Sequence, residues 1–385
     1  MSEKHKEVLR QVQTLEEAEQ IDQAIQLVTD NLKKLKPHVY LHFKLGHLYY
    51  STDRLENAKK SYQKAIEIMP EYLPAHKNLG IIYYHDGEHK KALSHLSASL
   101  PSLTPKENDL LVLASCQKNL GLDASAVRTL EWGLSLFPLN MNIRELLIES
   151  YTILEHYDKA RDVILESLKL EGEKYNLWLG LSSTYLNEGQ ALKGIQALEV
   201  AYLLRPENHL LALQLGDLYY NENMLEDALS YYIKAKEHKP LSLPLRRMAR
   251  AYLAMGENEK ALSELNKITE RTSETKLMEA EIYQNLDKHE EALNLLKQLQ
   301  QKNDTQGRMS YLAGLSAYSL NLFQEAEDFF NRARNYPHYR IVSLKYLIII
   351  ATKKGQQTEA ASLAHEALKW APDDKWFLKM LGGKD

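Results

Sequence analysis

The sequence contains little cysteine, proline, glycine and phenylalanine, and the shortage of cysteine excludes two kinds of structure. The 385 residues include 1 Cys, 11 Pro, 16 Gly and 6 Phe. Proline and glycine are the residues that interrupt helices, so their scarcity bears on the fold. Because Cys116 is the single cysteine, an internal disulfide framework and a cysteine-rich zinc site are both excluded.

Long apolar runs and an excess of one charge are also missing. The longest compact apolar run, residues 346–351, is far too short to cross a bilayer, and the N-terminal residues lack the apolar stretch of a secretory signal. The 48 Lys and Arg residues nearly balance the 52 Asp and Glu residues, which gives a net charge of -4. We therefore expect a cytoplasmic protein without a membrane or nucleic-acid partner.

Three stretches of the sequence read almost alike. Residues 45–50, 79–84 and 215–220 each follow the pattern Leu-Gly-x-x-Tyr-Tyr. The similarity extends downstream, and it indicates an internal repeat. The first and third stretches are followed at the same spacing by Ala58, Tyr62, Ala65 and Pro70, and by Ala228, Tyr232, Ala235 and Pro240.

One small residue recurs at a regular interval in each unit along the whole chain. The intervals between these residues are 34 six times, followed by 33, 31, 34 and 34. Chance does not produce ten such intervals, so the sequence predicts about eleven tandem units. The residues are Ala24, Ala58, Ala92, Ala126, Ala160, Gly194, Ala228, Ala261, Ala292, Ala326 and Ala360.

Each unit has the apolar spacing of two helices joined by a turn. In the second unit, Leu41, Leu45 and Leu48 recur with a helical period, and a second amphipathic helix follows. There, Ala58 lets two helix backbones approach closely, and the ring of Tyr62 fills the space beside them. Between the helices we expect a residue in the left-handed conformation: Gly87, Gly121, Gly189, Asn223, Gly256, Asn321 or Gly355.

The prolines test this all-helical interpretation independently. None of the 11 falls in the middle of an expected helix. Pro74 and Pro244 fall in the first turn of a first helix, where proline is tolerated, and the others lie at or near the ends of units.

The 34-residue period resembles that of the tetratricopeptide repeat, a helix–turn–helix unit. The resemblance covers residues 5–374. It implies an all-α fold, a right-handed superhelical solenoid of stacked antiparallel helix pairs, in which each pair buries its apolar face against its neighbours. The length alone would suggest two or three globular domains, but we expect one continuous solenoid.

The repeats differ along the chain. The two short intervals lie between Ala228 and Ala292, and the loss of three residues near 269–273 should tighten a turn or shorten a helix. We expect a local kink there, with two sub-rods, 1–241 and 242–385, as the alternative. The expected segments are a degenerate capping repeat (1–38), regular repeats (39–241), two repeats with shortened spacing (242–306), two further repeats (307–374), and a C-terminal capping helix and tail (375–385).

No set of residues predicts catalysis, so we expect no enzyme activity, no cofactor and no metal. Cys116 lies among leucines of a first helix, which is typical of a buried small hydrophobe rather than a nucleophile. His38 and His42 have the spacing of metal ligands on a helix, but no nearby carboxylate or thiol completes a site. The sequence has no glycine-rich phosphate loop, no GxSxG and no HExxH motif.

The resemblance also implies where a partner binds. In such repeats, six positions of the first helix line an inner groove that binds peptides or partner chains. A wider set of these positions includes Ile81, Leu213, Leu253, Leu277, Glu281 and Arg308. The predicted contact residues are Tyr40, Phe43, Lys44, His47, Tyr50, Lys77, Asn78, Tyr84, Gln214, Asp217, Tyr220, Arg246, Arg247, Arg250 and Tyr311.

One subclass of the family grips the C-terminal carboxylate of chaperone tails with Lys and Asn at fixed groove positions. Here only Asn78 matches that pattern. Phe43 and His47 stand where Lys and Asn are required before it, and Asn108 and Val112 stand where Lys and Arg are required after it. We therefore do not expect a clamp for chaperone tails.

The arginines of the eighth unit allow two interpretations. Arg246, Arg247 and Arg250 could hold an acidic peptide through bidentate hydrogen bonds, or they could pair within the chain with Asp217 and Glu281.

The tyrosines fall into two groups, one facing the groove and one in the core. Those at the twelfth position of each unit (Tyr50, Tyr84 and Tyr220) should face the groove, whereas Tyr49, Tyr62, Tyr83, Tyr219 and Tyr232 should lie mostly in the core.

The predicted function is therefore a non-catalytic scaffold or adaptor for protein–protein interaction. It would hold another protein or peptide, one with acidic character, in its concave groove. The alternatives are a self-assembling structural repeat protein or a subunit of a larger complex, and a regulatory or RNA-binding helical-repeat protein. The sequence leaves the oligomeric state open.

Overall fold

The computed structural model describes residues 2–238, 242–300 and 307–382. In these residues the chain forms 23 α-helices and one short 3₁₀ helix, η1 (Leu100–Ser102), without a strand. The chain divides into two compact units, unit 1 (Met1–Ala197) and unit 2 (Leu198–Asp385), and the boundary in the sequence falls within α12. The predicted all-α class is confirmed.

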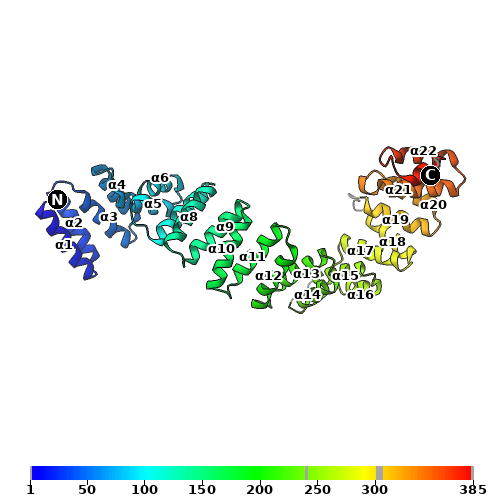
Figure 1. Ribbon diagram of the computed structural model, residues 1–385, viewed down its shortest axis with the longest axis horizontal. Coiled ribbons are helices and arrows are strands. Elements are labelled where there is room, and N and C mark those ends of the chain that lie inside the picture. The colour runs from blue at the N-terminus through cyan, green and yellow to red at the C-terminus, as the bar shows by residue number, and fades with distance from the viewer. Residues whose placement is uncertain (1, 239–241, 301–306, 383–385) are drawn as a thin grey trace. The chain divides into compact units, whose positions relative to one another are not determined.

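The odd-numbered helices α1 to α21 are the first helices of the repeats (Figure 1). Most of them have 13 residues, as the repeat length requires. Their bounds are α1 (Glu3–Glu17), α3 (Val39–Ser51), α5 (Leu73–His85), α7 (Glu107–Asn119), α9 (Met141–Ile153), α11 (Tyr175–Asn187), α13 (His209–Asn221), α15 (Ser242–Ala254), α17 (Ser273–Asn285), α19 (Arg308–Ser319) and α21 (Pro337–Lys353).

The even-numbered helices α2 to α22 are the second helices, and α23 (Lys375–Met380) follows the last pair. Their bounds are α2 (Ile21–Lys34), α4 (Leu55–Ile68), α6 (His89–Ser99), α8 (Asp123–Leu136), α10 (Tyr157–Leu170), α12 (Ala191–Leu204), α14 (Leu225–His238), α16 (Asn258–Asn266), α18 (His289–Gln300), α20 (Phe323–Ala333) and α22 (Gln357–Leu368).

From α1 to α11 in unit 1 and from α13 to α23 in unit 2, each helix packs against the next one along the chain, so helix pairs stack in sequence order. In unit 2 the first helices α13, α15, α17, α19 and α21 also contact one another in succession, and α5, α7 and α9 do so in unit 1. First helices therefore lie side by side and form one continuous surface of each unit, which we call the first-helix surface. This stacking buries apolar faces that a single helix pair would leave exposed.

A glycine and a large ring hold the two helices of several repeats together. Tyr62, Tyr232 and Phe330 are fully buried, as are Ala58 and Ala65 beside Tyr62. A methyl group on Gly46 would lie 2.6 Å from the Tyr62 ring. The same contact recurs between Gly216 and Tyr232 and between Gly314 and Phe330, each pair sixteen residues apart in the sequence. The predicted core role of Tyr62 and Tyr232 is confirmed.

The turns between paired helices contain a left-handed residue, as predicted. Gly87, for example, has φ +76° and its amide donates to Tyr84 at 3.0 Å. All seven predicted turn residues have positive φ. Four acidic residues that were not predicted from the sequence adopt the same conformation in other repeats, namely Glu19, Asp53, Glu155 and Asp287.

Two repeats differ from the regular pattern, one at α16 and one at the C-terminus. α16 has 9 residues whereas α14 has 14, so the shortened spacing does shorten a helix. At the C-terminus, Phe377 of α23 is fully buried in the core cluster of the last repeats. Pro240 and the expected segment ends at 241 and 306 lie outside the described residues.

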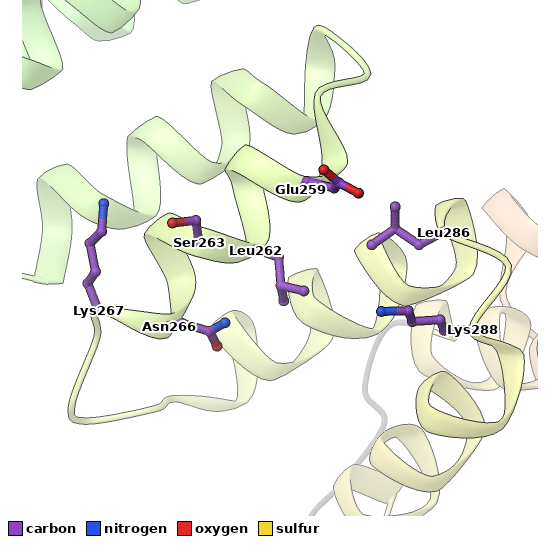
Figure 2. Close-up of a pocket in the computed structure, with 7 residues that line it drawn as sticks. All are labelled: Glu259, Leu262, Ser263, Asn266, Lys267, Leu286 and Lys288. Atoms are coloured by element: carbon purple, nitrogen blue, oxygen red, sulfur yellow. The ribbon is translucent and has the colours of Figure 1, made fainter.

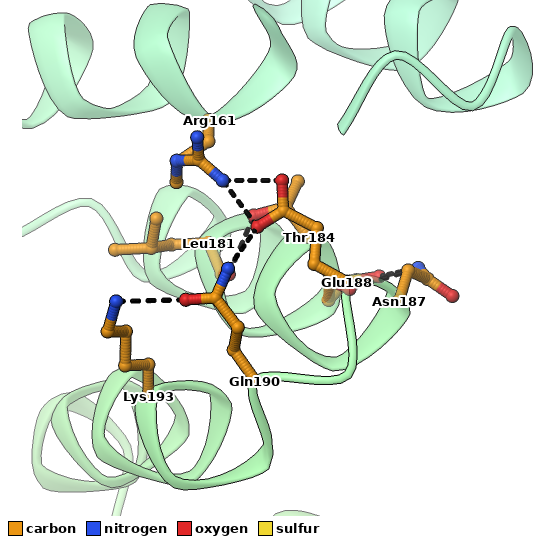
Figure 3. A network of polar contacts seen from close by, with 8 residues as sticks. Arg161, Leu181, Thr184, Asn187, Glu188, Gln190 and Lys193 are labelled. Carbon is orange, nitrogen blue, oxygen red and sulfur yellow. Dashed lines mark hydrogen bonds and ion pairs between the residues drawn. The ribbon is translucent and has the colours of Figure 1, made fainter. Parts of the chain in front are cut away.

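Polar bridges link each repeat to the next in parts of both units. Arg161 of α10 pairs with Glu188, the residue that follows α11, and Glu188 also accepts a hydrogen bond from Gln190 at 2.9 Å (Figure 3). Lys193 of α12 donates in turn to Gln190 at 2.9 Å. Equivalent ion pairs, also 27 residues apart, join Lys59 to Asp86 at 2.8 Å and Glu327 to Lys354 at 2.7 Å.

No helix in the described part of the chain combines the length and the apolar character needed to cross a membrane.

A half-buried histidine pair in unit 1 links stability to pH. Nδ1 of His95 on α6 lies 2.8 Å from Nδ1 of His76 on α5, and the His95 ring stacks on Tyr83 at 5.7 Å. Burial, followed by the neighbouring His76, lowers the pKa of His95 below its ordinary value of 6.5. The folded state therefore favours neutral His95, whereas the unfolded chain takes up a proton as the pH falls through about 6.5.

We expect the melting temperature to fall as the pH is lowered from about 7.5 to about 5.5, because the unfolded state then binds more protons than the folded state. The pKa values of His38, His42 and His47 are lowered in the same direction by burial, so they add to the slope. In His95→Gln the slope should be shallower, since glutamine can bond to His76 but does not titrate. Identical slopes in thermal melts of the two proteins would exclude His95 as a contributor.

Candidate functional site

The aromatic residues predicted as contacts on α3 differ in their exposure. Tyr40 and Phe43 both contact the ring of Tyr72, at centroid distances of 5.6 and 5.2 Å. Phe43 is half-buried and also lies 5.7 Å from the Tyr62 ring, so it belongs to the packing between repeats. Tyr40 is 42% exposed and remains on the surface.

The predicted polar contacts of unit 1 are bonded within the chain. Lys44 pairs with Glu16 of α1. Lys77 pairs with the buried Asp109 of α7 at 3.2 Å. Asn78 donates from Nδ2 to the hydroxyl of the buried Tyr62, also at 3.2 Å. These bonds fix the three side chains and shape the first-helix surface of unit 1.

Four first-helix residues of unit 1 line a small pocket between α3 and α5. They are His47, Tyr50, Asn78 and Ile81, and the pocket has a volume of about 120 Å³. Pockets for small molecules measure roughly 300–1,000 Å³, so this one has room for a single side chain. Tyr50 is 39% exposed at its rim. Tyr84, further along α5, is half-buried.

In unit 2, two of the three arginines on α15 are paired within the chain. Arg246 donates to Glu274 of α17 at 2.5 Å, and Arg247 pairs with Asp217 of α13 at 2.9 Å. Asp217 also accepts a hydrogen bond from the buried Tyr232 hydroxyl at 2.8 Å. The internal pairing with Asp217 that the sequence allowed is therefore present for Arg247, whereas Arg246 pairs with Glu274 and not with Asp217 or Glu281.

Arg250 differs from its two neighbours. It is exposed, and its guanidinium group lies 4.8 Å from the centre of the Tyr220 ring. Among the described residues no carboxylate is paired with it. Gln214 is exposed on α13, whereas Tyr311 of α19 is half-buried and stacks on Tyr339 at 5.2 Å, so Tyr311 contributes to packing.

A larger pocket, which we call the α15 pocket, lies on the first-helix surface of unit 2 and has a volume of about 440 Å³. Its residues come from α13, α15, α17 and α19, and they include several of the predicted groove positions. The lining residues are Tyr220, Arg250, Leu253, Ala254, Glu274, Leu277, Met278, Glu281 and Arg308.

The α15 pocket combines fixed charges with an apolar floor. Glu281 accepts a hydrogen bond from Arg308 Nε at 3.1 Å, so it pairs with α19 and not with the arginines of α15. Leu253, Leu277 and Met278 supply apolar surface between the charged groups. Such a pocket can hold an extended peptide segment with one charged and one apolar side chain.

A third hollow, of about 580 Å³, lies beside the shortened helix α16 (Figure 2). Leu262, Asn266 and Lys267 of the α16 region line one side, and Leu286 and Lys288 line the other. The sequence predicted either a tightened turn or a shortened helix here but not this hollow, because the space depends on which turn of the next repeat lies beside the shortened helix.

Cys116 is fully buried, and burial raises the pKa of its thiol to about 11. A raised pKa disfavours the thiolate, which is the form that acts as a nucleophile or a metal ligand. The sequence-based interpretation of Cys116 as a buried small hydrophobe is therefore confirmed.

Two segments of the chain match known family models. Residues 40–87 match the model described as TPR repeat, and residues 277–340 match the model described as tetratricopeptide repeat. The first segment lies in unit 1 and the second in unit 2.

Two curated proteins align with part of the chain. Anaphase-promoting complex subunit 3 of Schizosaccharomyces pombe is 22% identical over 227 residues, which are 58% of this chain and 34% of that protein. Human protein O-mannosyl-transferase TMTC1 is 25% identical over 215 residues, which are 52% of this chain and 23% of that protein. The chain thus spans about a third or less of the length of these relatives.

A solved structure of Naa15/Naa10 bound to HypK-THB has a similar fold, with a TM-score of 0.54 and 15% identity over 97% of this chain and 64% of that one. The repeat period, the stacked helix pairs and the two matched segments agree with one another. Residues 40–87 and 277–340 of this chain are tetratricopeptide repeats, and the stacked helix pairs of the described residues have the same architecture.

Proposed function

We propose that this chain is a non-catalytic interaction scaffold, acting alone or as a subunit of a larger complex, that holds a segment of a partner protein against its first-helix surface. The observation that carries the proposal is the α15 pocket, because side chains from four first helices build it. Its position on stacked helices means that the surface is formed before a partner arrives, so that little conformational entropy is lost on binding.

Two further observations support a binding role. Helix pairs occupy nearly all of the described residues, and the Cys116 thiol is buried with a raised pKa. One relative is named as a subunit of the anaphase-promoting complex, and the protein of similar fold was solved as an assembly with two others.

Blocking the α15 pocket tests the proposal. Ala254 is exposed at the end of α15 and lines the pocket, so Ala254→Trp should fill it without disturbing the core. The matched control is Ser230→Trp, which places the same side chain at an exposed position of the second helix α14. Each protein is used as bait in a cell extract, and bound proteins are quantified by mass spectrometry.

We expect at least one protein to be retained by the wild type and by Ser230→Trp but to be depleted about ten-fold or more by Ala254→Trp. Circular dichroism should show equal helicity in all three baits. If every retained protein binds Ala254→Trp as well as it binds the control, the α15 pocket is not the interaction surface and the proposal is wrong.

A further inference from the structure

We propose that the α15 pocket anchors its partner through one carboxylate side chain, bound by Arg250 on the face of Tyr220, next to an aliphatic side chain of the same segment. This inference rests on the proposed function, since it names the chemistry of the partner at the same surface. It replaces the arrangement of three cooperating arginines that the sequence allowed, because two of those arginines are already paired.

The charge balance of the pocket favours an anion. Three arginines and two glutamates lie in or beside it, so the net charge is +3 − 2 = +1. Arg246 is neutralised by Glu274, and Arg308 is neutralised by Glu281. The remaining positive charge is that of Arg250, which pairs with no carboxylate among the described residues.

The geometry of Arg250 suits a planar anion. The Tyr220 ring supports the guanidinium group at 4.8 Å and restricts its motion. The N–H groups at the edge of a stacked guanidinium stay free to donate in parallel to the two oxygens of a carboxylate. The binding group is therefore positioned before the partner arrives, which reduces the entropy lost on binding.

Two glutamates in the pocket disfavour an anion with two charges more than an anion with one. Glu274 and Glu281 both line the pocket, 7 positions apart on α17. A phosphate group carries close to two negative charges at neutral pH and would be repelled by both carboxylates. A single carboxylate is repelled less and can still be matched by Arg250.

The apolar floor of the pocket favours an aliphatic residue next to the acidic residue of the partner segment. Leu253, Leu277 and Met278 present apolar surface beside Arg250. An aliphatic residue adjacent to the acidic one in an extended segment would cover this surface and exclude water from the ion pair. Removing water strengthens the interaction between the two charges.

Three synthetic peptide pools test the inference directly. Each pool has randomised flanks around a fixed pair, Glu-Leu, Gln-Leu or phosphoserine-Leu, and capped ends remove the terminal charges. Binding to the full chain is measured by fluorescence anisotropy for the wild type, Arg250→Gln, Ala254→Trp and Ser230→Trp. We expect the wild type to bind the Glu-Leu pool about ten-fold more tightly than the other two pools, and Arg250→Gln to bind the Glu-Leu pool no more tightly than the Gln-Leu pool.

The outcomes separate this inference from the proposed function. If Ala254→Trp weakens binding of all pools but the wild type does not prefer Glu-Leu over Gln-Leu, the pocket binds peptides and the carboxylate inference is wrong. A preference for the phosphoserine pool would also overturn the inference in favour of a dianion. If Ala254→Trp binds every pool as Ser230→Trp does, the proposed function fails together with the inference.

Discussion

Replacing Tyr62 by alanine is expected to lower the free energy of unfolding by about 3–5 kcal/mol, the range found for buried rings in other proteins. Tyr62 is fully buried between the helices of its repeat, with Ala58 and Ala65 beside it and Gly46 against its face. Alanine would leave a cavity in a region whose small residues cannot move inward to fill it. Urea unfolding followed by circular dichroism measures the change.

The matched control is Tyr62→Phe, which keeps the ring and removes the hydroxyl. That hydroxyl accepts a hydrogen bond from Asn78 at 3.2 Å, so the expected loss is only about 0.5–1.5 kcal/mol. If alanine and phenylalanine destabilised the protein equally, the hydrogen bond rather than the ring would hold the two helices together, and the packing argument would be wrong.

Adding one methyl group at Gly216 is expected to cost about 1–3 kcal/mol. The new carbon of Gly216→Ala would lie 2.4 Å from the Tyr232 ring, a distance at which the ring or the helix must shift. Tyr232 cannot move freely, because it is almost completely buried and its hydroxyl donates to Asp217 at 2.8 Å. Thermal and urea unfolding measure the change.

Gly180→Ala is the control for helix propensity. Gly180 lies within α11, and a methyl group there would meet Ile164 at 3.4 Å, an ordinary contact distance. Alanine should therefore stabilise α11 by about 0.5–1 kcal/mol. The two substitutions are chemically identical, so opposite signs would assign the effect at Gly216 to the Tyr232 contact. Equal changes in stability for Gly216→Ala and Gly180→Ala would contradict this assignment.

The sequence was sufficient to predict the helix pairs, because each one is specified locally. The pair Gly46 and Tyr62 stands sixteen residues apart in the sequence and meets in space, and the same spacing recurs at Gly216 and Tyr232. Left-handed turns were predicted where glycine or asparagine occurs. They were missed at Glu19 and Glu155, since glutamate rarely adopts positive φ and only the alignment of repeats would have shown the position.

The candidate site was predicted less completely, because it depends on which charges meet across neighbouring repeats. The pairing of Arg247 with Asp217 was one of two interpretations, and the structure contains it. Glu281 was considered as a partner for the same arginines but pairs with Arg308 instead. A sequence gives the spacing of such groups along each helix, whereas the direction of a long flexible side chain depends on the competing partners around it.

The short helix α16 indicates where this architecture accommodates changes in chain length. The interval from Ala261 to Ala292 is three residues shorter than the 34-residue period, yet α17 keeps the full 13 residues of a first helix. The missing residues are lost at the end of the second helix, α16, where the connection to the next repeat begins. Evolutionary insertions and deletions in proteins built this way should therefore accumulate at these connections, because there they leave the first-helix surface intact.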